Sequence, residues 1–212
     1  MSKRRERMKQ SYRLLFGPLT GAVLVFGVAG LGLTVPGYSH IHQTLSEIGE
    51  IGSPARASFT VLLCCVAACI LVFASAVRDL SLKLGHSSLG AYFIASMAAS
   101  AAGVGIFSFP HPLHNVFGMS ELIGYQAPLV LALTWRRDKQ AGSLVAFSYI
   151  MFALIWIALG LNMSAMDRQG TVWAQVHPVY GIVQRALFVT WFSWCAGVGV
   201  MLFRRQRRSP VA

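Results

Sequence analysis

Charged side chains are scarce in this sequence, and acidic ones are the scarcest. Only 12% of its 212 residues are charged, with seven Asp and Glu against 18 Lys and Arg. Soluble domains carry about 25% charged residues. Because 55% of the residues are hydrophobic, the composition indicates a membrane protein whose first partner is the lipid bilayer.

The sequence also lacks the pattern of a nucleic-acid binder, although its formal net charge is +11. A basic face with interleaved aromatic residues is absent. The basic residues instead cluster at the ends of apolar runs, where they flank membrane spans. We therefore expect no nucleic-acid partner.

Paired cysteines are missing as well. The chain has no CxxC spacing, and each of its four cysteines lies inside an apolar run. Cysteines in such a pattern are typical of small thiols buried in the membrane. They are Cys64, Cys65, Cys69 and Cys195.

Six apolar runs have about the 20 residues that a membrane span needs. The first is longer than the roughly 7–15 apolar residues of a signal peptide, so we expect it to remain as a span. The six predicted spans are Leu14–Val35, Phe59–Val77, Leu89–Phe109, Val116–Trp135, Ser143–Ala165 and Val179–Phe203.

Basic residues in short loops set the orientation of such spans. All but three of the 18 Lys and Arg residues fall on one side of a six-span arrangement; the three are Arg56, Arg168 and Arg185. The sequence therefore predicts an all-α, polytopic bundle of six transmembrane helices with both termini in the cytoplasm. Residues 1–13 form a basic cytoplasmic arm, 14–203 the transmembrane domain and 204–212 a basic cytoplasmic tail.

Two polar stretches between spans resemble one another at a fixed offset. The first is Pro36–Pro54, and the second is Phe107–Glu121 together with the following residues up to Pro128. The matched positions are Pro36 with Pro110, His40 with His114, Ser46-Glu47 with Ser120-Glu121, and Pro54 with Pro128. Either two-helix units repeat or the match is chance. In both cases the stretches cap the bundle on its outer side.

Two charged residues fall inside predicted spans, where an unpaired charge is costly. Glu121 lies in the fourth span and Arg185 in the sixth. We expect an ion pair between them, either as a lock between two helices or as a functional carboxylate held by Arg185. Together with Glu47 and His114, these residues form the predicted polar centre for a small molecule, a lipid or a protein partner.

Three histidines mark the outer ends of the three helical hairpins: His40, His114 and His177. If they converge, they suit a catalytic zinc ion with three protein ligands and a water. Glu47 or Glu121 would then serve as the base of a metal-dependent hydrolase. The alternative is a set of interfacial, hydrogen-bonded histidines. Zinc is the one cofactor that the pattern suggests.

Ser46 and Ser120 each precede a glutamate. A serine with a nearby histidine can act as a nucleophile. The alternative is a helix start, with the hydroxyl accepting a backbone N–H bond and the glutamate in the first turn.

Several short motifs resemble a family of bacterial and archaeal membrane proteins, the domain of unknown function DUF998. Its Ser-Glu-Leu-Gly-like motif is similar to Ser46–Gly49, and its Phe-Pro-x-Asp and Leu-His-Gly stretches are similar to Phe109–Asn115. Its Gln-Arg pair corresponds to Gln184-Arg185. Here Pro112 and Asn115 stand where the family carries Asp and Gly. The resemblance implies six membrane helices and a bacterial or archaeal cell membrane, and no settled activity.

The sequence thus favours a non-enzymatic membrane protein that binds a small molecule, a lipid or a protein partner at an outer polar cap. A zinc-dependent membrane hydrolase is the first alternative. A small transporter is the second, although no pair of short, broken apolar segments marks a transport site.

Overall fold

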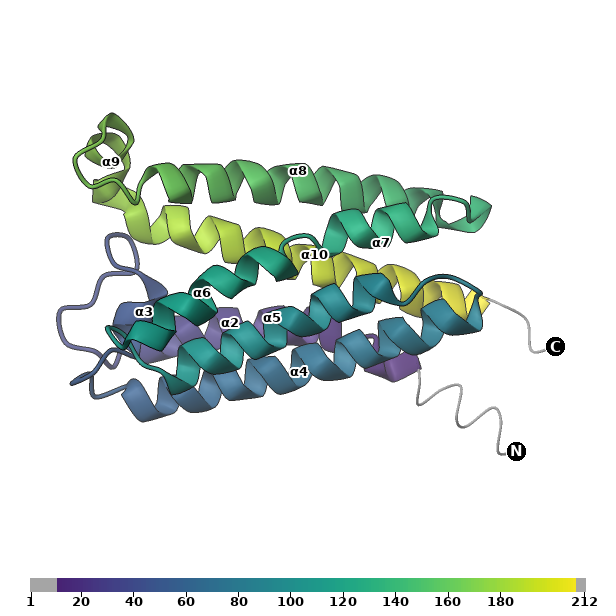
Figure 1. The fold of residues 1–212 in the computed structure, drawn as a ribbon. Coiled ribbons are helices and arrows are strands. Elements are labelled where there is room, and N and C mark those ends of the chain that lie inside the picture. The colour runs from purple at the N-terminus through teal and green to yellow at the C-terminus, as the bar shows by residue number, and fades with distance from the viewer. Residues whose placement is uncertain (1–10, 209–212) are drawn as a thin grey trace.

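The computed structural model describes residues 11–208, and this part of the chain is built of helices with no strand. Six helices are long and apolar enough to cross a membrane (Figure 1). The predicted all-helical bundle of six spans is therefore confirmed. Of the predicted basic arm, residues 1–10 lie outside the described part, and so do residues 209–212 of the predicted tail.

Some spans contain more than one helix. The six spans are Ser11–Gly32, Arg56–Lys83, Leu89–Ile106, Pro112–Trp135, Lys139–Ser164 and Thr171–Arg208. The long helices within them are α2 (Phe16–Gly32), α4 (Arg56–Lys83), α5 (Leu89–Ile106), α6 (Pro112–Gly124), α7 (Ala127–Trp135), α8 (Gly142–Ser164) and α10 (Tyr180–Arg208). The short elements are α3 (Leu45–Ile48), η1 (Lys139–Ala141), α9 (Thr171–Val176) and η2 (His177–Val179).

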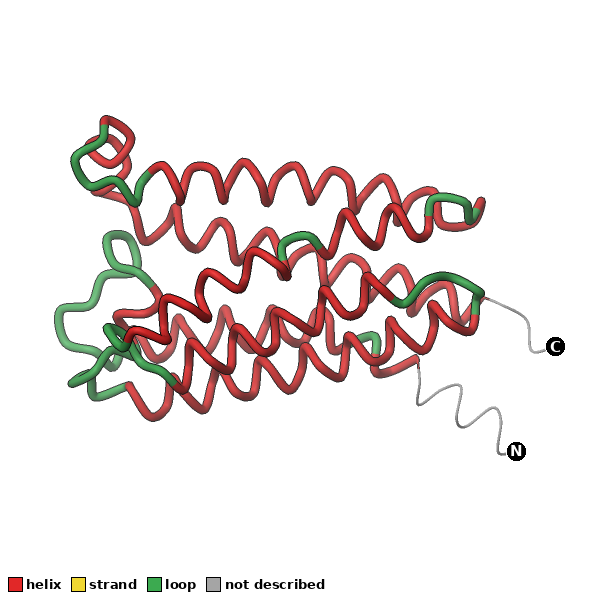
Figure 2. The backbone as a smooth tube through the Cα atoms, viewed as in Figure 1, coloured by secondary structure: helices red, strands yellow, loops and turns green. Residues whose placement is uncertain are grey.

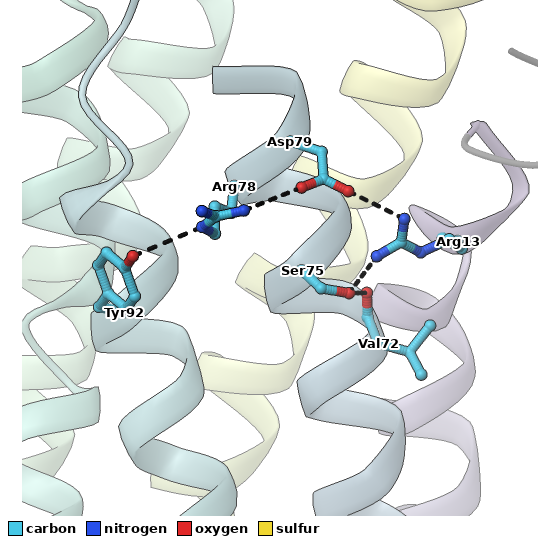
Figure 3. Close-up of polar contacts among 6 residues, drawn as sticks. All are labelled: Arg13, Val72, Ser75, Arg78, Asp79 and Tyr92. Atoms are coloured by element: carbon cyan, nitrogen blue, oxygen red, sulfur yellow. Dashed lines mark hydrogen bonds and ion pairs between the residues drawn. The ribbon is translucent and has the colours of Figure 1, made fainter. Parts of the chain in front are cut away.

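The second span extends beyond its predicted end at Val77, because its last turns carry polar side chains with partners. Asp79 accepts hydrogen bonds from Arg13 at 3.0 Å and from Arg78 at 3.3 Å (Figure 3). The Arg78 guanidinium also reaches the hydroxyl of Tyr92 on α5 at 3.5 Å. A prediction from hydropathy alone ends the span at its first charged residue. The contacts of these charged side chains allow the helix to continue.

Neighbouring spans run antiparallel, so all connections between spans lie at two ends of the bundle (Figures 1 and 2). The longer connections, 33–55, 107–111 and 165–179, lie at what we call the loop end. The opposite end, which we call the basic end, carries the start of α2, the connections 84–88 and 136–141, and the end of α10. Arg13, Arg78, Lys83, Arg136, Arg137 and the arginines of α10 from Arg204 onward gather at the basic end.

Close helix contacts depend on glycine. A side chain at Gly17 of α2 would collide with the backbone carbonyl of Cys195 on α10, and one at Gly199 of α10 would meet the carbonyl of Leu14. Small residues allow helix backbones to approach within a membrane. The first and last spans therefore pack tightly together near the basic end.

The fourth span is broken in its middle, between α6 and α7. Pro128 stands in the first turn of α7, and its ring nitrogen has no hydrogen to donate to the carbonyl of Gly124 four residues earlier. Proline at such a position interrupts a helix. As a result α6 packs on α5, while α7 packs on both α5 and α8. Figure 1 shows α6 running apart from α8 and α10 toward the loop end.

Candidate functional site

A cavity of about 1000 Å³ occupies the loop-end half of the bundle. Its walls come from α6 on one side, from α8 and α10 on the other, and from α4, α5 and the segment 42–50. It lies where the break at Pro128 turns α6 away from α8 and α10. The interrupted fourth span thus accounts for the space.

The cavity wall is mainly polar at the loop end and mainly apolar at depth, where Glu121 and Tyr125 beside the break in the fourth span are polar exceptions. Exposed residues of the loop-end connections belong to its wall, so it reaches the protein surface there; they include His42, Arg168 and His177. The deeper wall is formed by side chains in the middle of the spans: Val66, Met97, Leu159, Leu187, Phe188 and Phe192. This change from polar to apolar runs along the length of the six candidate spans.

Glu47 lies in this wall, with both carboxylate oxygens engaged. Oε1 accepts from the backbone N–H and the hydroxyl of Thr44 at 2.9 and 2.8 Å, and Oε2 accepts from the amide of Gln43 at 2.7 Å. Thr44 is the N-cap of α3 and Glu47 the third helical residue, which makes a capping box. The predicted helix start is therefore present, but the cap is Thr44 and not Ser46.

His114 lies in the first turn of α6, is 6% exposed and also lines the cavity. Its Nδ1 lies 2.8 Å from the carbonyl oxygen of Phe107, and its Nε2 lies 2.9 Å from the Oγ of Ser46. Ser46 lines the cavity as well. Of the two interpretations of Ser46 from the sequence, the structure supports proximity to a histidine.

Ser120, the matched position in the other polar stretch, has different surroundings. Its hydroxyl lies 2.7 Å from that of Ser100 and donates to the carbonyl of Phe117 at 2.7 Å. It stands in the middle of α6, so the predicted helix start at Ser120 is wrong. The two stretches are therefore not equivalent in structure at this position.

Glu121 and Arg185 do not form the predicted ion pair. The carboxylate of Glu121 accepts a hydrogen bond from the hydroxyl of Tyr125 at 2.8 Å, and no basic side chain lies within 4.0 Å among residues 11–208. The turn of α6 away from α10 explains the error. Glu121 lines the cavity, whereas Arg185 does not.

Arg185 instead holds the connection that precedes α3. It donates to the carbonyls of Gln43 and Gly181 at 2.8 Å each, to the hydroxyl of Tyr38, and to Nδ1 of His40 at 3.3 Å. Burial raises the pKa of the Tyr38 hydroxyl above its ordinary value, although the charge and hydrogen bond of Arg185 lower it. A separate cavity of about 250 Å³ lies beside His40 and Arg185.

The three histidines proposed as zinc ligands do not converge. His40 contacts Arg185, His114 contacts Ser46, and the ring of His177 lies 5.7 Å from that of Trp173. Within residues 11–208, no three His, Cys, Asp or Glu side chains gather closely enough to hold a metal ion. The predicted convergence is wrong because each ring is held by a different neighbour: His114 and His177 line the loop-end cavity, whereas His40 lies beside the smaller one.

Two polar residues of the cavity wall, Tyr125 and Asn162, were not singled out from the sequence, and a third, Gln184, was named only as part of the family's Gln-Arg pair. Tyr125 binds Glu121, Asn162 on α8 donates to the carbonyl of Val183 at 3.1 Å, and the Oε1 of Gln184 accepts from the backbone N–H of Leu45 at 2.8 Å. For Asn162 and Gln184, the signal in the sequence is a single amide side chain within an apolar run, because a polar group buried in lipid needs a partner.

The six spans and the cavity between them define a multi-pass membrane protein of the bilayer. A family model described as "Protein of unknown function (DUF998)" matches residues 18–201. The chain belongs to this family, which confirms the resemblance seen in its short motifs. No curated protein and no solved structure matches the chain.

Proposed function

We propose that this protein binds an amphiphilic ligand, a lipid or a lipid-like small molecule, in the loop-end cavity. The observation that carries the proposal is a cavity of about 1000 Å³ whose wall changes from mainly polar at the loop end to mainly apolar at mid-span. Cavities that hold small molecules measure about 300–1,000 Å³. This one is large enough for a ligand with a polar head and an acyl chain.

The deep wall suits the apolar part of such a ligand. Phe188, Phe192, Leu159 and Met97 present apolar surface from three different helices. Each methylene that moves from water into such surroundings contributes about 0.8 kcal/mol. A ligand that enters from water gains this free energy for each methylene group it buries, whereas one that enters from the bilayer gains chiefly from packing against these side chains.

The mouth of the cavity suits the polar part of the proposed ligand. Arg168, Glu50, His42 and His177 line it, and the Arg168 guanidinium lies 5.2 Å from the ring centre of Trp173. Tryptophan is typical of the interface between lipid chains and headgroups. A polar headgroup would lie at this level of the bilayer, with its chain directed toward the middle of the spans.

We further propose that the basic end faces the cytoplasm of a bacterial or archaeal cell, which places the cavity mouth on the outer side. The support is the distribution of Lys and Arg, since short cytoplasmic loops are rich in both. A green fluorescent protein fused after Ala212 should be fluorescent, and alkaline phosphatase fused there should be inactive. The reverse result would contradict the proposed orientation.

The binding proposal is tested by filling the cavity. Gly118 on α6 lines the cavity, and a side chain built at this position meets no atom within 4 Å. Gly118→Trp should lower the binding of cis-parinaric acid, a fluorescent acyl chain, about tenfold or more, which corresponds to about 1.4 kcal/mol. Fluorescence titration of the full chain in detergent measures this change.

Gly160 on α8 supplies the matched control. A side chain built at Gly160 also meets no atom within 4 Å, but this glycine is exposed and lies outside the cavity. Gly160→Trp should bind cis-parinaric acid like the unaltered protein. Equal binding by all three proteins, or no binding by any, would overturn the proposal.

A further inference from the structure

The hydrogen bonds of His114 determine which of its ring nitrogens carries the proton. The carbonyl oxygen of Phe107 can only accept, so Nδ1 of His114, 2.8 Å away, is the donor. In the neutral ring Nε2 is then an acceptor, and the hydroxyl of Ser46, 2.9 Å away, donates to it. A serine hydroxyl that donates to an imidazole held by a second acceptor is the arrangement of an activated nucleophile.

We propose that Ser46 is a nucleophile and His114 its general base, and that the pair cleaves an acyl ester bond in a ligand held in the loop-end cavity. This inference rests on the proposed function, because the cavity brings the ester to the serine. Both side chains belong to the cavity wall, so an ester carbonyl inside it can reach the Oγ of Ser46.

Both residues are held in place by their own surroundings. The capping box of Thr44 and Glu47 fixes α3, and the hydrogen bond from the Leu45 N–H to Gln184 ties α3 to α10. His114 is buried and its ring lies edge-on to that of Phe109, with centroids 5.8 Å apart. Catalytic groups held rigidly in advance of the reaction lower its barrier.

The reaction balances with water as the co-reactant. The Oγ of Ser46 attacks the ester carbonyl carbon, and its proton passes to Nε2 of His114. The bond from this carbon to the alcohol oxygen breaks, and the alcohol leaves with the proton from His114. Water then attacks the acyl-serine and gives its proton to His114, which returns it to the Oγ of Ser46 as the carboxylic acid is released.

Gln184 is placed to assist by stabilising the negative oxygen that forms. Its Oε1 is held by the N–H of Leu45, the residue before Ser46, and its amide nitrogen donates no hydrogen bond within residues 11–208. Because Gln184 lines the cavity, this amide can donate to the former carbonyl oxygen. Such donors act as an oxyanion hole.

The test uses an alkyl fluorophosphonate on the full chain in detergent. This reagent loses fluoride as an activated serine bonds to its phosphorus, so intact mass and peptide mapping locate the adduct. We expect the adduct on Ser46. Ser46→Ala should abolish it, and His114→Gln should slow it at least tenfold, because glutamine can accept the serine hydrogen bond but cannot take its proton.

Ser120→Ala is the matched control, since Ser120 pairs with Ser100 and lies outside the cavity wall. It should be labelled at the wild-type rate. No adduct on the unaltered chain, or an equal rate in His114→Gln, would overturn the inference. If cis-parinaric acid still binds in that case, the proposed function stands; if labelling occurs without such binding, the proposed function fails and the reactive serine remains.

Discussion

The indole N–H of Trp191 on α10 donates a hydrogen bond of 3.0 Å to the carbonyl oxygen of Gly124, the last residue of α6. This is the carbonyl that Pro128 leaves without its usual partner four residues later. An unpaired carbonyl within a membrane is costly. The bond from Trp191 offsets this cost and joins the break in the fourth span to the sixth.

Trp191→Phe should therefore destabilise the protein by about 1–3 kcal/mol, the cost of a buried polar group left unsatisfied together with the lost contacts. In a Pro128→Ala background the cost should be smaller, because the N–H of the new alanine can return to Gly124. Unfolding by denaturant in detergent micelles measures both values, and their difference is the coupling free energy.

Trp194→Phe is the control for this cycle. Its indole donates to the hydroxyl of Ser148 at 3.0 Å, away from the break. Its effect should be the same with proline or alanine at position 128. Equal costs of Trp191→Phe in the two backgrounds would show that the indole does not compensate for the proline.

Arg185→Gln should loosen the connection 38–43. Its guanidinium donates to Tyr38, His40 and Gln43, and hydrogen bonds to a charged group contribute about 1.5–3 kcal/mol each. Loss of these bonds should speed amide exchange in this connection by about tenfold or more, since the loss of even one of them corresponds to about a factor of ten; hydrogen–deuterium exchange would measure this change. Arg185→Lys should restore little of the protection from exchange, because an ammonium group lacks the planar set of donors of a guanidinium.

The comparison for Arg185 is Arg168→Gln. Arg168 is exposed and lies over Trp173, so its loss should leave exchange in residues 38–43 unchanged. If both variants behave alike, the connection is held by other contacts.

Asp138 at the basic end should make stability depend on acid pH. Burial alone would raise the pKa of Asp138, but hydrogen bonds from Arg205, from the backbone N–H of Gln140 and from His86 hold it below its ordinary value. A lowered carboxyl pKa stabilises the folded state above the unfolded-state pKa of about 3.9. This contribution is lost as the pH falls through the lower, folded-state pKa.

The melting temperature of Asp138→Asn should therefore lie below that of the unaltered protein at pH 6, and the gap should close as the pH falls below about 4. Asp167→Asn is the control, since Asp167 accepts a local turn bond from the N–H of Gln169. A gap for Asp138→Asn that persists unchanged at pH 3 would contradict the proposed role of the ionised carboxylate.

Pro128 shows how far sequence reasoning reaches in this chain. The proline was visible within the fourth apolar run, yet a single interruption does not make the pair of broken segments that marks many transport sites. Which way the chain turns at a break depends on what packs on each side. Here α5 and α8 hold α7, while α6 packs mainly on α5, and the cavity results.

The amino-acid sequence by itself determined the six spans and the family, because hydropathy and short motifs are local properties that do not depend on how helices rotate or tilt. Tertiary structure alone decided that His114 meets Ser46 and that Glu121 meets Tyr125 and not Arg185. Such partners depend on the tilt of α6 relative to α10. That tilt is set by the packing free energy of whole helices, so no short stretch of sequence determines the tilt.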